Sequence, residues 1–204
     1  ICTCLVGSEM CIRDRYNRRH LYILAKDGDI PIAQFGSKYQ GVPNDEGATM
    51  SEDIFSGLPH ELELCEGAPI LVTSNIWVSA GLMNGTRGTL RAIIYRKGDR
   101  PDHDDPQRQL PHVILAECPT YSGPAFFDVD RFPERRHWVP FFPREASIEN
   151  DKGITRTQYP LTLAWALTPW KAQGMTLEHL VVKLGEAAGL SLIHISEPTR
   201  QVQI

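Results

Sequence analysis

The residues best suited to chemistry lie in one short stretch, TPWKAQG, at residues 168–174. Thr168 fits the N-cap of a helix, and Pro169 fits its first position, where a missing N–H costs nothing. Gly174 suits a left-handed stop after about one helical turn. Free N–H groups beside Lys171 would attract an anion such as phosphate. The alternative is a capped turn that carries a solvated lysine.

Two apolar segments must position this stretch. Large and small side chains alternate through residues 161–168, and the large set is Leu161, Leu163, Trp165 and Leu167. This alternation predicts one strand that is covered on both faces. HLVVKL (residues 179–184) predicts a second buried strand. The order of strand, helical turn, glycine and strand places the candidate anion site at the edge of a sheet.

The middle of the chain is typical of short strands separated by turns. Leu62 and Leu64 alternate with glutamates, which predicts a half-exposed strand, and residues 68–72 predict a more buried one. Asn84-Gly85 signals a hairpin because both residues tolerate positive φ. Further strands are expected at residues 21–30, 89–95, 112–117 and 137–143, a short helix at 51–56 and a solvated loop at 97–109. Many short strands suggest a small barrel.

Composition excludes little. The chain has 204 residues and a formal net charge of -4, and it holds no apolar run long enough to span a membrane. Its five cysteines show neither a disulfide pattern nor metal-ligand spacing, which favours a reducing compartment. The histidines and the aspartates at 102, 104 and 105 have no ligand spacing either, so no metal site is predicted.

Both ends of the chain are expected to be foreign to the natural sequence. Residues 5–15 and 190–200 can be encoded by the two strands of one DNA duplex, read in different frames, and the outermost residues fit the same duplex. This duplex resembles a transposase adapter used for sequencing libraries. We therefore expect residues 1–15 and 190–204 to be translated adapter, and we attach no function to His194.

Three blocks between these ends resemble the C-terminal half of Pif-type DNA helicases of superfamily one. In the family's order they are LPHELELCEGAPILVTSN (58–75), GLMNGTRGTL (81–90) and QYPLTLAWALTPWKAQGMTLEHLVVKL (158–184). The resemblance implies an α/β fold, a partial RecA-like parallel-sheet domain with an inserted small, mostly antiparallel β-barrel. It assigns residues 16–92 and 158–189 to the second RecA-like domain, and residues 93–157 to the barrel.

The same resemblance implies roles for the residues of the opening stretch. Thr168 and Lys171 would contact DNA phosphates, whereas Gln173 and Gly174 would face the nucleotide cleft. Trp170 stands where the family usually has a histidine. A tryptophan cannot accept a hydrogen bond, but it could stack on a DNA base or pack into the core.

A second candidate contact lies beside the Asn84-Gly85 turn. Arg87 could meet a DNA phosphate, while Asn84, Gly85 and Gly88 are expected to form the turn, with a DNA-facing loop as the alternative. Residues 134–138 (ERRHW) mix cations with an aromatic, a composition that suits either a nucleic-acid-binding face or a solvated cluster.

The function implied by the resemblance is that of an ATP-dependent DNA helicase, which uses ATP and Mg²⁺ to move along single-stranded DNA. It implies a monomeric motor of the nucleus or mitochondrion, acting in DNA repair, recombination, and telomere or mitochondrial DNA maintenance. The chain has no phosphate loop, and the arginine finger would follow residue 189, so the fragment itself is expected to be inactive. The alternatives are a non-enzymatic nucleic-acid-binding β-barrel module and a helicase of a mobile element.

Overall fold

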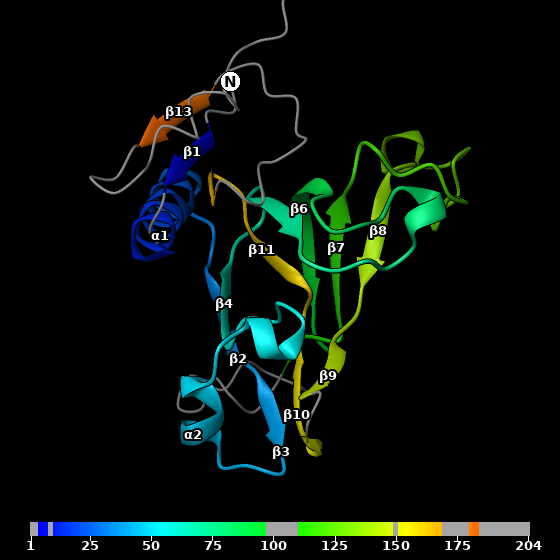
Figure 1. Cartoon of the computed structure of the whole chain (residues 1–204). Helices are drawn as coiled ribbons and strands as arrows, with labels where there is room; N and C mark the ends of the chain where they lie inside the picture. The colour runs from blue at the N-terminus through cyan, green and yellow to red at the C-terminus, as the bar shows by residue number, and fades with distance from the viewer. Residues whose placement is uncertain (1–3, 8–9, 97–109, 149–150, 169–179, 184–204) are drawn as a thin grey trace, which may run out of the picture. The chain divides into compact units, whose positions relative to one another are not determined.

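A computed structural model describes residues 4–7, 10–96, 110–148, 151–168 and 180–183. The described residues form two compact units (Figure 1). One unit comprises the residues up to Asn17 together with those from Trp165 onward, and the other is Arg18–Ala164. Each unit is presented by itself below.

The smaller unit contains a three-stranded parallel sheet in the order β12-β1-β13. Its strands are β1 (Cys4–Gly7), β12 (Ala166–Leu167) and β13 (Leu180–Lys183). Leu5 lies opposite Ala166 on one side and opposite Val181 on the other. The strand expected at residues 179–184 is therefore confirmed. The central strand comes from residues that the sequence predicts to be translated adapter, and that origin stays a prediction.

Helix α1 (Met10–Gly28) follows β1, and it shows that the strand expected at residues 21–30 is wrong. The buried side chains are Arg13, Asn17, Leu21 and Ala25, which recur every four residues, as they do on one face of a helix. Two of the four are polar, so the apolar pattern in the sequence is too short to show the helical period. After Gly28 the chain turns through Asp29, whose φ is 49°.

The larger unit is built on a five-stranded sheet in the order β11-β5-β6-β7-β8, with every neighbouring pair antiparallel. Its strands are β5 (Pro69–Val72), β6 (Arg87–Ile94), β7 (Val113–Glu117), β8 (Trp138–Phe141) and β11 (Leu161–Leu163). The strands expected at 68–72, 89–95, 112–117 and 137–143 are thus confirmed, with shifted ends. Strand β8 ends the sheet, and it contains Pro140.

Two smaller sheets complete this unit. Strands β2 (Ala33–Gly36) and β4 (Glu61–Leu64) form an antiparallel pair, and β3 (Lys38–Gln40), β10 (Asp151–Gln158) and β9 (Arg144–Ile148) form an antiparallel sheet in that order. Along β4, Leu62 and Leu64 are buried and the two glutamates are half-buried, as expected. Helix α2 (Asn44–Thr49) and the 3₁₀ turn η1 (Asp53–Phe55) connect β3 to β4, and the turn lies where a short helix was expected.

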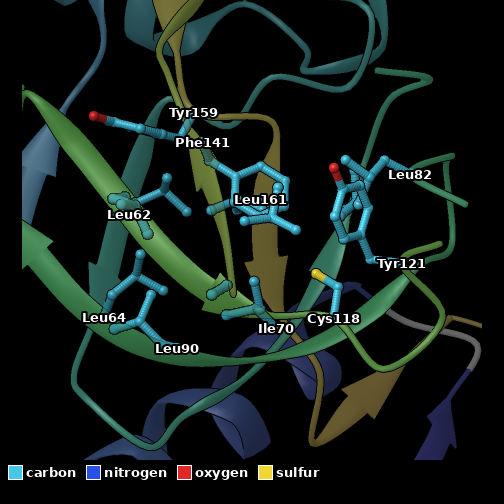
Figure 2. Close-up of a cluster of buried hydrophobic side chains, with 14 of the residues drawn as sticks. Leu62, Leu64, Ile70, Leu82, Leu90, Cys118, Tyr121, Phe141, Tyr159 and Leu161 are labelled. Carbon is cyan, nitrogen blue, oxygen red and sulfur yellow. The ribbon is translucent and has the colours of Figure 1, made fainter. Parts of the chain in front are cut away.

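The core of this unit is shared by the five-stranded sheet and the β2-β4 pair (Figure 2). Apolar side chains from both sheets bury one another, among them Phe35, Leu64, Ile70, Leu90, Ile114 and Leu161. Tyr159 is also fully buried, and its hydroxyl donates a 2.7 Å hydrogen bond to the carbonyl oxygen of Pro111. The ring of Phe35 meets that of Tyr159 edge-to-face. A buried tyrosine needs such a partner for its hydroxyl.

Arg156 is a fully buried cation that anchors β10. Its guanidinium donates to the carbonyl oxygens of Leu58 at 2.8 Å, and of Gly47 and Met50 at 2.9 Å each. The same group lies 4.2 Å from the ring centre of Phe55. Burial lowers the pKa of this guanidinium from its ordinary value. Arg156 therefore holds the segment from α2 to β4 against a strand about a hundred residues away in the sequence.

The single strand expected at residues 161–168 is wrong. The chain forms two short strands there, and each pairs with a different partner: β11 is antiparallel to β5, and β12 is parallel to β1. Between them the backbone N–H of Ala164 donates to the carbonyl oxygen of Pro69 at 2.9 Å. The chain therefore changes partner at this point, and both Ala166 and Leu167 are buried, as expected for a strand that is covered on both faces.

Candidate nucleic-acid interface

The structure describes two of the six candidate site residues. Thr168 follows β12 directly and is half-buried, and Arg87 is the first residue of β6. Trp170, Lys171, Gln173 and Gly174 lie outside the described residues. The helical turn that Thr168 would cap lies there too, so the capped anion site stays a prediction.

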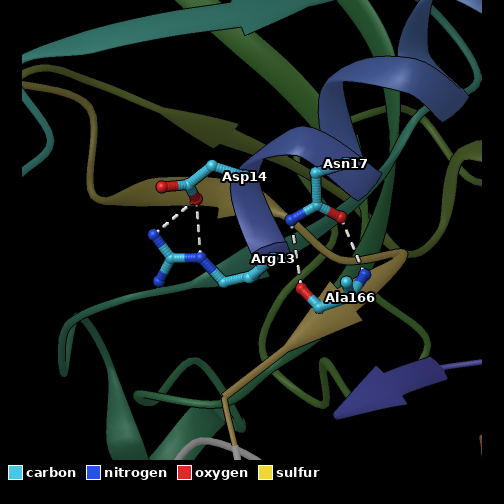
Figure 3. Close-up of polar contacts among 4 residues, drawn as sticks. All are labelled: Arg13, Asp14, Asn17 and Ala166. Atoms are coloured by element: carbon cyan, nitrogen blue, oxygen red, sulfur yellow. Dashed lines mark hydrogen bonds and ion pairs between the residues drawn. The ribbon is translucent and has the colours of Figure 1, made fainter. Parts of the chain in front are cut away.

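The strand that leads into Thr168 is held by Asn17 of helix α1 (Figure 3). The side-chain amide donates from Nδ2 to the carbonyl oxygen of Ala166 at 3.0 Å, and its Oδ1 accepts the N–H of Ala166 at 2.7 Å. This pair of bonds imitates the backbone of a neighbouring strand, and Asn17 is buried. Asn17 therefore fixes the chain two residues before Thr168.

Sequence reasoning missed Asn17, whose importance becomes visible only once the buried face of α1 is known. Asn17 lies four residues after Arg13 and four before Leu21, on the buried face of α1. A buried amide needs hydrogen-bond partners, so a polar residue on such a face indicates a specific contact. Its neighbour Arg13 has a local partner, because Nε donates to Oδ1 of Asp14 at 2.7 Å (Figure 3).

The Asn84-Gly85 turn precedes Arg87 and closes the connection between β5 and β6. The N–H of Thr86 donates to the carbonyl oxygen of Met83 at 2.9 Å, and Gly85 has a φ of 93°. Asn84 has no positive φ, so only one of the two residues uses the left-handed region, contrary to the expectation. The connection is also longer than a two-residue hairpin, since it runs from residue 73 to residue 86.

Two glycines flank this turn, and the structure gives each a steric reason. Gly81 has a φ of 81°, and a Cβ built on it would overlap the carbonyl oxygen of Thr120. A Cβ on Gly88 would lie 2.8 Å from the carbonyl oxygen of Glu117. The side-chain hydroxyl of Thr86 also donates to the carbonyl oxygen of Gly81 at 2.9 Å. The block GLMNGTRG is therefore a scaffold that positions Arg87 at the start of β6.

Within the ERRHW segment, Arg135 packs among aromatic rings. The guanidinium of Arg135 lies 4.5 Å from the ring centre of Phe132 and 5.0 Å from that of Trp138, and it forms a 3.4 Å ion pair with Glu134. Aromatic rings and a carboxylate thus surround this cation, although its buried Nε has no hydrogen-bond partner among the described residues. The nucleic-acid-binding face considered for residues 134–138 stays a hypothesis.

The described part of the chain contains no group of three or more histidine, cysteine or acidic side chains placed to hold a metal ion. His103 and the aspartates at 102, 104 and 105 lie outside it. None of the described helices is both long and apolar enough to cross a membrane. Cys65 and Cys118 are free and buried, and burial raises the pKa of the Cys118 thiol to about 12.

Comparison with known proteins finds similar sequences among DNA helicases. Residues 54–92 match the family model for the 2B domain of the DNA helicase Pif1. The ATP-dependent DNA helicase PIF1 of Danio rerio is 28% identical over 146 residues, which cover 72% of this chain and 19% of that protein. The resemblance to Pif1-type DNA helicases is confirmed. The chain spans about a fifth of the length of this curated relative.

Solved Pif1 structures show the same fold. Pif1 helicase from Candida albicans aligns with a TM-score of 0.62 at 21% identity, over 89% of this chain and 38% of that one. Pif1 helicase from Bacteroides, in complex with ADP-AlF3 and ssDNA, aligns with a TM-score of 0.55 at 17% identity, over 90% of this chain and 34% of that one. The expected fold class, a partial RecA-like parallel sheet with an antiparallel β insert, is confirmed.

The Pif1 family match covers β4, β5, the Asn84-Gly85 turn and most of β6. The resemblance in the first two sequence blocks thus falls on residues with structural roles in the antiparallel unit. The match ends at residue 92, inside β6, where the sequence placed the start of the barrel. The domain boundaries stay a prediction.

Proposed function

We propose that this chain is part of an ATP-dependent DNA helicase that moves along single-stranded DNA and unwinds duplexes. The observation that carries the proposal is the joint match of residues 54–92 to the Pif1 2B domain and of most of the chain to a PIF1 helicase. Because the chain spans about a fifth of that relative, the activity is that of the parent protein. The fragment is expected to show no ATP hydrolysis of its own.

Within the parent, we assign the parallel strands β12, β1 and β13 to the second RecA-like motor domain, and the five-stranded sheet to the inserted domain. The insert would then begin before residue 93, since β5 and β6 pair within one sheet with β7 and β8. The family match from residue 54 supports this earlier start.

The DNA contacts are proposed at the segment that follows β12. Thr168 and Lys171 would bind backbone phosphates and Trp170 a base face, while Arg87 would add a phosphate contact. Such contacts do not depend on base sequence, as a translocating motor requires. The two hydrogen bonds between Asn17 and Ala166 support this assignment, because they fix the strand end that leads into the segment.

ATP would bind with Gln173 and Gly174 at the edge of its cleft, and Mg²⁺ would neutralise its phosphates. The described residues provide no acidic cluster for the metal, so its ligands would come from elsewhere in the parent protein. We further propose roles in DNA repair, recombination, and telomere or mitochondrial DNA maintenance. The motor would be monomeric and would act in the nucleus or mitochondrion.

Two other functions remain to be tested against this one, namely a non-enzymatic nucleic-acid-binding module and a mobile-element helicase. The comparisons favour a helicase over the binding module. Extending the reading frame upstream separates them. A phosphate loop and an acidic strand in frame support the motor, and a complete frame without them rejects it.

The DNA contact is tested on the fragment itself. Lys171→Ala should weaken binding of labelled single-stranded DNA, and it should reduce the slope of log affinity against log salt by about 0.7, because one phosphate contact is lost. Asp104→Ala is the matched control and should leave both quantities unchanged. Equal affinity of the two variants would remove Lys171 from the site.

A further inference from the structure

Strand β12 has two partners, and only one of them is expected to be natural. The strand ends the parallel sheet among the described strands, and it pairs there with β1. Residues 1–15, which include β1, are expected to be translated adapter. Asn17 of helix α1 is the second partner, and it lies in the part of the chain expected to be natural. The contact between Asn17 and Ala166 is therefore the one that the parent protein is expected to share.

Asn17 binds both backbone groups of a single residue. Its Nδ2 donates to the carbonyl oxygen of Ala166 at 3.0 Å, and its Oδ1 accepts the N–H of Ala166 at 2.7 Å. Figure 3 shows the amide of Asn17 facing that backbone from the helix. Because hydrogen bonds are directional, the two bonds together fix both the position and the orientation of Ala166.

Asn17 is itself out of reach of a ligand. It is only 4% exposed, so its amide cannot bind a DNA phosphate directly. Burying an amide is unfavourable unless its hydrogen bonds are made. Leu21 and Ala25, further along the same buried face of the helix, show that apolar side chains are accepted there. The amide at position 17 therefore serves a specific arrangement of the chain.

Thr168 is the described candidate residue that this arrangement affects most directly. It follows β12 and lies two residues after Ala166. Two residues span at most about 7 Å, so a shift or rotation at Ala166 is passed on to Thr168. Thr168 is half-buried, and it is proposed to bind a phosphate. A binding group of this kind has to be held to within about 0.5 Å of its productive position.

We propose that Asn17 is a positioning residue for DNA binding, which holds the backbone at Ala166 so that Thr168 meets a phosphate of single-stranded DNA. The inference rests on the proposed function, because it takes Thr168 to be a DNA contact. It adds a residue of helix α1 that acts on DNA only through the end of β12. Loss of Asn17 and loss of the Thr168 hydroxyl therefore remove the same contact.

The test is a double-mutant cycle on the full 204-residue chain, read by fluorescence anisotropy of a labelled 15-nucleotide oligothymidylate. Asn17→Ala and Thr168→Val should each weaken binding about fivefold. The double variant should also bind about fivefold more weakly, because the second change has no further contact to remove. Two independent effects would instead multiply to about 25-fold.

Leu21→Val is the matched control, since it alters the same buried face of helix α1 and removes no hydrogen bond to β12. It should leave the affinity unchanged. Circular dichroism checks that every variant is folded. If Asn17→Ala is not, Asn17→Asp takes its place in the cycle, because a carboxylate keeps the acceptor for the N–H of Ala166. Its effect should likewise be lost once residue 168 is valine.

Several results would overturn the proposal and leave the proposed function intact, provided that Lys171→Ala still weakens binding. They are unchanged affinity for Asn17→Ala or for Thr168→Val, and losses that multiply in the double variant. A loss for Leu21→Val as large as that for Asn17→Ala would overturn it too, because any damage to the helix would then suffice. If Thr168→Val and Lys171→Ala both leave the affinity unchanged, the proposed DNA contacts themselves fail, and this inference fails with them.

Discussion

The two units of this chain differ in where their strands come from. In the larger unit, β5, β6, β7 and β8 follow one another in sequence and pair in that order. In the smaller unit, the paired strands come from residues 4–7, 166–167 and 180–183. Antiparallel neighbours need only a local connection, whereas parallel neighbours need a crossover. Local sequence signals therefore describe the first unit well and the second poorly.

The candidate residues divide in the same way. Gly85 and Gly88 were expected to form a turn, with a DNA-facing loop as the alternative, and the structure explains them, like Gly81, by backbone geometry inside the antiparallel unit. The proposed binding segment instead connects two strands of the parallel sheet. The proposed chemistry thus lies in the unit whose paired strands come from distant parts of the chain. The following variants test this contrast, from the largest expected effect to the smallest.

Arg156→Met should destabilise the antiparallel unit most. The change removes three hydrogen bonds from a charged donor and leaves the carbonyl oxygens of Leu58, Gly47 and Met50 without this partner. We expect the free energy of unfolding, measured in urea, to fall by about 4 kcal/mol. Arg91→Met is the control, since its ion pair with Glu117 is exposed and should contribute less than about 1 kcal/mol. Equal losses would show that Arg156 is no anchor.

Gly81→Ala should cost about 3 kcal/mol, because alanine at a φ of 81° is strained and its Cβ overlaps the backbone of Thr120. Gly57→Ala is the matched control. Its φ is 76°, but its nearest neighbour would be 3.7 Å away, so only the strain of about 1–2 kcal/mol applies. Urea unfolding of both variants measures the difference. Similar costs would mean that the close approach to Thr120 is unimportant.

Asn17→Ala should act on the smaller unit, with a cost of about 2 kcal/mol, because Ala166 loses a partner for both its N–H and its carbonyl oxygen. Hydrogen exchange should speed up at the amide of Ala166 and stay unchanged in β6. Asn17→Asp keeps the acceptor and loses the donor, so its effect should be intermediate. Faster hydrogen exchange at both Ala166 and β6 would contradict the expectation that Asn17 stabilises only the smaller unit.

The smallest expected effect is on how the stability of the chain depends on pH. Burial raises the pKa of Cys118 to about 12, above its ordinary value near 9. Between these values the unfolded chain releases a proton that the folded chain retains, so stability falls as pH rises through this window. We compare the free energy of unfolding in urea at pH 8 and at pH 9.5. The Cys118→Ala variant should lose less of it over this range than the unsubstituted chain, by under about 1 kcal/mol. An identical loss would mean that the thiol ionises normally.

The fold was predictable where one face of a strand is buried and the turns are local. Leu62 and Leu64 show this, as does the apolar run at 68–72. The helix over residues 21–28 could not be predicted, because the polar Asn17 interrupts the apolar face that would have revealed the helical period. The break between β11 and β12 near Ala164 could not be predicted either, since it depends on a change of strand partner that no local sequence pattern contains. Asn17 itself was missed because its partner lies 149 residues away.

Pro140 in β8 bears on how this protein behaves at high concentration. The strand ends its sheet, and an open edge is where a second molecule could add a strand of its own. Proline supplies no backbone N–H, so one rung of any such intermolecular ladder would lack its donor. The edge strand is thereby protected against sheet-to-sheet association, and Pro140→Val would be expected to increase self-association of the chain.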